Sequence, residues 1–169
     1  MSLKVWQFAG YHNSGKTTFI TNLVKRLKEV GLKAAVIKHH GHHGTHLADP
    51  NTDTGKHWFA GADAVTYVDG ATLSHLSKTP FQLAELIQFY ENHGNVDVLL
   101  VEGFKHAAFN KVLFHRSADD DNLITTLKGI QMIITMDDPK RIGNKAGVQV
   151  YSNGAIDQAI EDLMTRIGV

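Results

Sequence analysis

The segment Gly-Tyr-His-Asn-Ser-Gly-Lys-Thr, from Gly10 to Thr17, decides the fold that this sequence predicts. It fits the pattern G-x-x-x-x-G-K-[ST], in which a glycine-rich loop holds phosphate groups. The apolar run Lys4–Ala9 precedes it and predicts a buried strand. After it, apolar residues at helical spacing predict a helix that ends near Gly31. Because the motif lies between a predicted strand and a predicted helix, we interpret it as a nucleotide-binding loop. A glycine-rich turn that matches the pattern by chance is the less favoured interpretation.

The fixed positions of this loop each have a chemical reason. Glycine lets the backbone approach a phosphate closely, and free N–H groups at the start of the helix then point at the anion. We predict that Lys16 bridges the β- and γ-phosphates as a catalytic residue, and that the Thr17 hydroxyl binds Mg²⁺. The predicted nucleotide-binding residues in this segment are Gly10, His12, Asn13, Ser14, Gly15, Lys16, Thr17 and Thr18.

The rest of the chain predicts strands that extend a sheet. A second strand over Lys33–Ile37 completes a strand–helix–strand unit, the unit that builds parallel sheets. Later apolar runs predict strands over Val96–Val101, Lys111–His115, Ile130–Thr135 and Val148–Tyr151. We therefore predict an α/β fold of the P-loop NTPase type, with three layers, a mainly parallel sheet and one domain over residues 1–169.

Further helices and a hairpin complete the expected elements. Helical patterns cover Lys56–Ala62, the segment from Pro80 to His93, and Ile156–Ile167. Two short apolar runs, Ala64–Val68 and Thr72–Leu76, flank Asp69-Gly70 and predict a small β-hairpin insertion.

A carboxylate at the end of the strongest predicted strand is the second candidate at the phosphate site. The segment Asp97–Gly103 has the form of a Walker B strand, with Glu102 near its carboxyl end. Open α/β sheets bind ligands at this edge, so we predict Glu102 as a catalytic residue and a magnesium ligand. An ordinary surface acid at a strand end is the alternative. Asp53 is a weaker candidate for the metal, and a plain loop acid is equally open there.

The stretch from Lys38 to Gly55 predicts a polar loop, and its first part, Lys38 to His46, holds five histidines. Neutral imidazoles bind transition metals, so a zinc or nickel site is one interpretation. The alternative is a loop whose histidines contact phosphate, a partner or water. This alternative is favoured because no cysteine accompanies the cluster.

Composition excludes several classes of function. Lys plus Arg and Asp plus Glu number 17 each, so the net charge is zero and no basic nucleic-acid surface is expected. The chain has no cysteine, which excludes disulfides, thiolate catalysis and cysteine-based zinc sites. The sequence contains no apolar run of about 20 residues, so it predicts no membrane span. The N-terminal residues also lack a signal-peptide pattern. We therefore expect a cytoplasmic protein that binds neither nucleic acid nor membranes.

Together these segments resemble the molybdopterin-guanine dinucleotide biosynthesis protein B (MobB) family. The resemblance is specific because the motifs keep the family's order over most of the chain. It is carried by Gly10–Thr18, Val36–His43 with its Ile-Lys-His-His, Asp53–Lys56, Ala60–Ala62, Val101–Lys105 with its Val-Glu-Gly-Phe-Lys, and Lys111–Arg116.

The resemblance implies a GTP-binding protein with weak, Mg²⁺-dependent hydrolysis. It implies that the protein acts as a partner of the molybdenum cofactor guanylyltransferase, the enzyme that joins GMP to molybdopterin. It also implies that the protein forms a homodimer. Molybdopterin is a further candidate ligand. GTPases often read guanine with an Asn/Thr-Lys-x-Asp segment, and here Asp138 in Thr135-Met136-Asp137-Asp138 is the candidate. That segment lacks the lysine, so a chance loop acid remains open.

Two other functions remain open from the sequence. A metallochaperone-type GTPase would use the histidine-rich loop, although the lack of cysteine argues against it. A small-molecule kinase would gather several cations around the γ-phosphate, and the four arginines Arg26, Arg116, Arg141 and Arg166 are widely scattered. We expect slow hydrolysis, because no glutamine positions a water and no arginine finger is evident, although Arg116 could act across a dimer.

Overall fold

The computed structural model describes residues 3–39 and 48–169, without the side chains of residues 144–146. The chain divides into two compact units, one made of Met1–His40 and Ile87–Val169 and the other of Gly41–Leu86. Each unit is described by itself below. The single domain expected over residues 1–169 stays a prediction.

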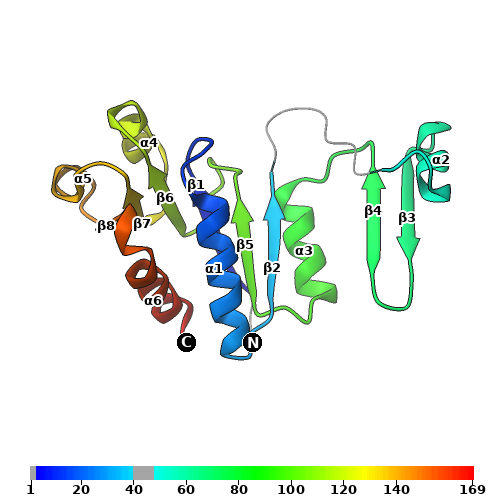
Figure 1. The fold of residues 1–169 in the computed structure, drawn as a ribbon, viewed down its shortest axis with the longest axis horizontal. Helices are drawn as coiled ribbons and strands as arrows, with labels where there is room; N and C mark the ends of the chain where they lie inside the picture. The colour runs from blue at the N-terminus through cyan, green and yellow to red at the C-terminus, as the bar shows by residue number, and fades with distance from the viewer. Residues whose placement is uncertain (1–2, 40–47) are drawn as a thin grey trace. The chain divides into compact units, whose positions relative to one another are not determined.

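A six-stranded sheet forms the first unit (Figure 1). Every neighbouring pair of its strands is parallel, as expected for a chain of strand–helix–strand units. Because β1 lies inside the sheet, the strands that follow it in the chain lie on both of its sides, and ligands bind at such a switch point. The spatial order is β2 (Ala34–Lys38), β5 (Val98–Glu102), β1 (Lys4–Ala9), β6 (Lys111–His115), β7 (Ile130–Thr135) and β8 (Gln149–Ser152).

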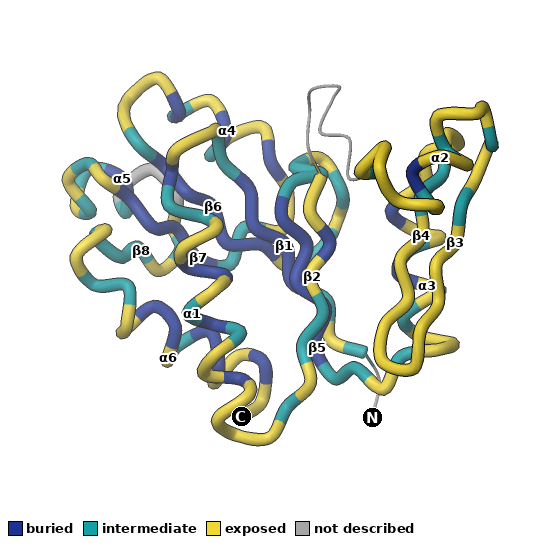
Figure 2. The backbone as a smooth tube through the Cα atoms, turned by 45° about the vertical axis from the view of Figure 1, so that its right-hand side comes forward, coloured by how far each residue is buried: buried dark blue, intermediate teal, exposed yellow. Residues whose placement is uncertain are grey.

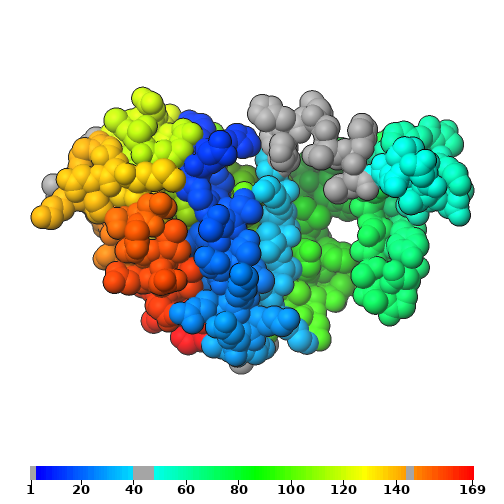
Figure 3. Space-filling view, in the orientation of Figure 1, coloured from blue at the N-terminus to red at the C-terminus, as the bar shows by residue number. Residues whose placement is uncertain are grey.

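Helices cover both faces of this sheet. On one face α1 (Lys16–Glu29) and α6 (Ile156–Ile167) pack against each other, as Figures 1 and 3 show. On the other face lie α4 (Asp121–Thr126) and α5 (Pro139–Ala146). α3 (Leu83–His93) begins in the second unit and ends in the first.

The core follows from the alternation of side chains along the strands. Phe8, Phe114 and Ile134 point toward α1 and α6, whereas their strand neighbours Leu113 and Ile133 point toward α4 and α5. All five side chains are buried, and Figure 2 shows burial concentrated in the central strands. This two-sided burial explains why these strands read as unbroken apolar runs in the sequence.

The second unit holds a short helix and a hairpin. The strands β3 (Ala64–Val68) and β4 (Leu73–Ser77) pair antiparallel. Asp69 closes the turn, because its Oδ1 accepts hydrogen bonds from the backbone N–H groups of Ala71 and Thr72 at 2.8 and 2.6 Å. The predicted β-hairpin is therefore confirmed.

The predicted fold class is confirmed. The bounds of several strands differ from the predicted ones by one or two residues, and the larger differences lie at helices. α2 spans Asp53–Phe59 and starts three residues before the predicted Lys56, because the Thr52 hydroxyl accepts the Gly55 N–H at 3.0 Å and caps it. α3 starts at Leu83, beyond the predicted start at Pro80. α4, α5 and two single-turn 3₁₀ helices, Ala118–Asp120 and Asn153–Ala155, were not predicted.

Lys111 is a fully buried cation in β6 whose partners are backbone carbonyls. Its Nζ donates to the carbonyl oxygens of Ala107, Phe109 and Lys128 at 2.8, 3.1 and 2.5 Å. Burial lowers the pKa of this ammonium group. The contacts join the chain before β6 to the turn before β7, so one side chain fixes two loops.

We expect Lys111→Met to lower the free energy of unfolding by about 2–3 kcal/mol, because the substitution leaves three carbonyl groups without their donor. Urea unfolding followed by circular dichroism measures this loss. Lys25→Met, at an exposed position of α1, serves as the control and should change stability by less than about 0.5 kcal/mol. Equal stability of the two variants would contradict the assigned role of Lys111.

Candidate nucleotide-binding site

The loop between β1 and α1 has a backbone that depends on its glycines. Gly10 has a φ of 149°, and a Cβ there would lie 2.6 Å from the carbonyl oxygen of Phe114 in β6. Gly15 has a φ of 87°, and Asn13 has a φ of 57°. Glycine adopts such angles without strain, and asparagine tolerates the left-handed region better than most residues. The fixed glycines of the motif are therefore explained by close packing and by backbone angle.

The start of α1 has unused hydrogen-bond donors. Among the described residues, no side chain caps this end of α1, and its first turn holds no acidic residue. Its first N–H groups therefore have no acceptor within the helix, and they lie at the positive end of the helix dipole. A helix start of this kind binds anions such as phosphate.

Lys16 adds a full positive charge above this loop. Its Nζ donates to the Tyr11 carbonyl oxygen at 2.6 Å and to the Ser14 hydroxyl at 3.0 Å. Burial lowers the pKa of Lys16, while the nearby Glu102 carboxylate acts in the opposite direction. The ammonium group is thus held over the loop by weak neutral acceptors that a phosphate oxygen could replace.

Thr17 and Glu102 come together as the sequence predicted. Glu102 ends β5 and is buried, and the Thr17 hydroxyl donates to its two carboxylate oxygens at 3.1 and 3.3 Å. A hydroxyl and a carboxylate are the hard oxygen donors that Mg²⁺ prefers. The residues present therefore fit a magnesium ion that accompanies a bound polyphosphate.

Lys38 also reaches this pair, although no motif in the sequence assigned it a role. It ends β2 and lies beside Glu102 in the parallel register. Its Nζ lies 3.3 Å from Thr17 Oγ1 and 3.4 Å from Glu102 Oε1. The register could have revealed it, since residues at the carboxyl ends of adjacent parallel strands meet at one edge of the sheet.

Arg116 supports the loop from the side of β6. Its guanidinium group binds both carboxylate oxygens of the buried Asp120 at 2.9 Å, and this hydrogen bonding lowers the pKa of Asp120. It also donates to the His12 carbonyl oxygen at 3.2 Å and lies 5.2 Å from the ring centroid of Tyr11. Lys105 Nζ lies 4.8 Å from the centroid of the same ring. The loop is therefore bounded by cations.

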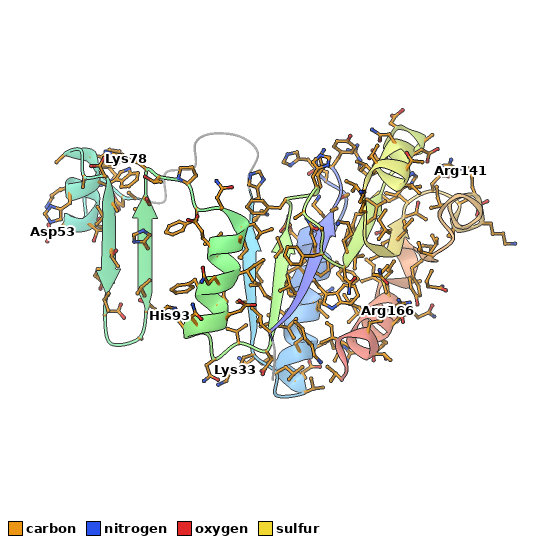
Figure 4. All side chains as sticks on the ribbon, turned by 180° about the vertical axis from the view of Figure 1, so that it is seen from behind. Lys33, Asp53, Lys78, His93, Arg141 and Arg166 are labelled. Carbon is orange, nitrogen blue, oxygen red and sulfur yellow. The ribbon has the colours of Figure 1, made fainter. Side chains whose placement is uncertain are left out.

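The other predicted site residues lie at different places. The side chains of His12, Asn13 and Thr18 are exposed on the loop and the first turn of α1. Asp138 follows β7 and caps α5, where its Oδ1 accepts the Lys140 N–H at 2.9 Å. Asp53, which Figure 4 labels, begins α2 in the second unit, and its carboxylate pairs with Lys56 at 2.9 Å. The guanine contact of Asp138 and the metal contact of Asp53 stay predictions.

The histidine-rich stretch is represented by His39, which packs its ring 4.4 Å from that of Phe104. His40, His42, His43 and His46 lie outside the described residues. Over residues 3–39 and 48–169, no group of three or more His, Asp or Glu side chains could hold a metal ion. In the same ranges, no helix is long and apolar enough to cross a bilayer.

Comparisons with known proteins agree with this geometry. A curated relative from Bacillus subtilis (strain 168) is described as a "Probable molybdopterin-guanine dinucleotide biosynthesis adapter protein". It is 38% identical over 133 residues, which cover 75% of this chain and 73% of the relative. A second, from Haemophilus influenzae, is described as a "Molybdopterin-guanine dinucleotide biosynthesis adapter protein". It is 32% identical over 109 residues, 63% of this chain and 60% of its own length.

Solved structures extend the similarity to the whole fold. The crystal structure of a MobB protein homolog from Bacillus stearothermophilus aligns with a TM-score of 0.74 and 26% identity, covering 96% of this chain and 97% of the other. The family model described as "Molybdopterin guanine dinucleotide synthesis protein B" matches residues 5–138, which include the loop, Lys38, Glu102 and Arg116. Since that match spans most of the sequence and all of the site described above, the chain belongs to the MobB family.

Proposed function

We propose that this chain binds GTP together with Mg²⁺ and serves as an adapter in the synthesis of molybdopterin guanine dinucleotide. One observation carries the proposal: the uncapped start of α1, the Lys16 ammonium group and the Thr17–Glu102 pair converge at one point. The choice of GTP and of the pathway rests on the family, whose curated relatives are described as adapter proteins for molybdopterin-guanine dinucleotide biosynthesis.

The chain's own groups account for polyphosphate binding. The N–H groups of the loop and of the first turn of α1 would surround the β-phosphate, and Lys16 would exchange its contacts with Tyr11 and Ser14 for phosphate oxygens. Thr17 and Glu102 would hold Mg²⁺, which neutralises charge on the β- and γ-phosphates when it is bound. Asp53 is a further proposed ligand of that ion.

We expect slow hydrolysis because every arginine side chain is already paired with a carboxylate. All four pair with carboxylates: Arg26 with Glu29 and Glu161, Arg116 with Asp120, Arg141 with Asp121 and Asp137, and Arg166 with Asp162 (Figure 4 labels Arg141 and Arg166). A free arginine finger accelerates phosphoryl transfer by about 10³–10⁵-fold. Without one the chain suits an adapter that senses nucleotide better than an enzyme with rapid turnover.

The proposed partners are the guanylyltransferase that attaches GMP to molybdopterin and a second copy of this chain. The hairpin offers apolar surface for such contacts. Val68 and Leu73 face each other across β3 and β4, and each exposes more than half of its surface, 66% and 62%. Large exposed apolar side chains that cluster in this way are common at protein interfaces.

We expect isothermal titration calorimetry in Mg²⁺ to show binding of GTP and much weaker binding of ATP. Lys16→Ala should weaken GTP binding by about 100-fold, because charge-assisted hydrogen bonds to phosphate contribute about 3 kcal/mol. Lys25→Ala, on an exposed position of the same helix, is the control and should bind like the wild type. A preference for ATP, or no binding of either nucleotide, would remove the guanine assignment.

The adapter role predicts a physical complex with the guanylyltransferase. We expect immobilised guanylyltransferase from the same organism to retain this chain in the presence of GTP and Mg²⁺. An adenylate kinase, which carries a P-loop of its own, should pass through the same column. Equal retention of both proteins, or of neither, contradicts the adapter proposal while leaving nucleotide binding intact.

The dimer proposal predicts that one charge on the hairpin shifts the self-association equilibrium. We expect Val68→Glu to raise the dimer dissociation constant by at least about tenfold in sedimentation velocity, since it places a carboxylate on the exposed apolar pair. Ser74→Glu adds the same charge at an exposed position on the opposite face of β4 and is the control. If both variants behave alike, the hairpin face is not the dimer contact.

A further inference from the structure

Lys38 occupies a place that a divalent cation would need. Its Nζ contacts both Thr17 Oγ1 and Glu102 Oε1, at 3.3 and 3.4 Å. The Thr17 hydroxyl in turn donates to Glu102 at 3.1 Å. The ammonium group therefore contacts both of the oxygen donors that we assign to Mg²⁺.

The charge on Glu102 explains why an ammonium group lies there. The Glu102 side chain keeps only 10% of its surface exposed, and a buried carboxylate is costly without a counter-charge. Lys16 is directed to Tyr11 and Ser14, so in the described part of the chain the one ion pair to Glu102 comes from Lys38. Removing Lys38 would leave this carboxylate without an ion-pair partner.

The side chain of Lys38 is also partly exposed to solvent. It belongs to the last residue of β2 and keeps half of its surface exposed, 50%, on a flexible four-carbon stem. It can therefore leave the Thr17–Glu102 pair by rotation of its own stem without any change in the strand.

We infer that Lys38 is the resident counter-ion of this site: its ammonium group takes the position of Mg²⁺ in the nucleotide-free protein and moves to the polyphosphate when the hydrated ion enters. The inference deepens the proposed function and rests on it for the second step. Two consequences follow. The nucleotide-free protein binds a bare divalent cation poorly, and the protein tolerates a polyphosphate beside Glu102 even without metal.

The first test measures a divalent cation alone, without nucleotide. Mn²⁺, which shares the preference of Mg²⁺ for oxygen donors, is titrated into the free protein and detected by electron paramagnetic resonance. We expect Lys38→Met to lower the dissociation constant for Mn²⁺ by at least about tenfold, because it removes a repelling charge a few ångströms from the ion. Lys38→Arg keeps the charge and should resemble the wild type. Lys33→Met, just before the other end of β2, is the matched control and should change nothing.

The second test compares GTP binding in Mg²⁺ and in EDTA by calorimetry. We expect Lys38→Met to weaken GTP binding in EDTA by at least about tenfold more than GTP binding in Mg²⁺. In this variant only the metal offsets the charge of Glu102, and EDTA removes the metal.

A double variant identifies the ligand of the divalent cation. In the Mn²⁺ titration, Lys38→Met/Glu102→Gln should lose the gain in affinity that Lys38→Met shows, which identifies Glu102 as the ligand. Circular dichroism confirms that each variant is folded.

These outcomes separate the inference from the proposed function. Identical Mn²⁺ affinity of the wild type and Lys38→Met overturns the inference, whether or not GTP binds. Failure of the wild type to bind GTP in either buffer removes the proposed function and the movement of Lys38 to the polyphosphate. The Mn²⁺ titration still decides whether Lys38 occupies the cation position.

Discussion

The start of α1 carries backbone N–H groups without a side-chain cap among the described residues, and the structure around it is organised to keep them in place. Gly10 packs against the carbonyl of Phe114, which fixes the loop to β6, and Arg116 holds it again through the carbonyl of His12. The parallel register then brings Lys38 and Glu102 to the same edge. A helix end of this kind is stable only because the sheet and the buried face of α1 stabilise the loop that precedes it.

Much of this arrangement could be predicted because it is local. The loop pattern identified Lys16 and Thr17, and the apolar run before Glu102 placed that carboxylate at a strand end, where Thr17 now donates to it. α5 escaped prediction although its signals are present: Asp138 caps it, Pro139 begins it and Gly147 follows it. Lys38 could not be assigned, since its role depends on strand order, and the support that Arg116 gives the loop depends on a contact between segments far apart in the chain.

The distribution of charge favours a nucleotide sensor over the other two functions considered. Lys16, Lys38 and Arg116 all act on this one loop, and the carboxylates that oppose them at Lys16 are Glu102 and Asp120. A kinase gathers free arginines around the phosphate, and here each arginine already has an acidic partner. His39 is packed on Phe104, and nothing in the described residues adds to the case for a metal carrier.

Lys111 gives this fold an internal reporter of its integrity. Of the lysine side chains that the structure describes, only this one is fully buried. The three backbone carbonyl oxygens that accept its hydrogen bonds come from two different loops. An amine-reactive reagent, or an acetyltransferase, can therefore reach Lys111 only when those loops separate, whereas the surface lysines react in the native state. Modification at Lys111 therefore records that a given molecule has opened, and a chain acetylated there before folding would have lost the donor that joins the two loops.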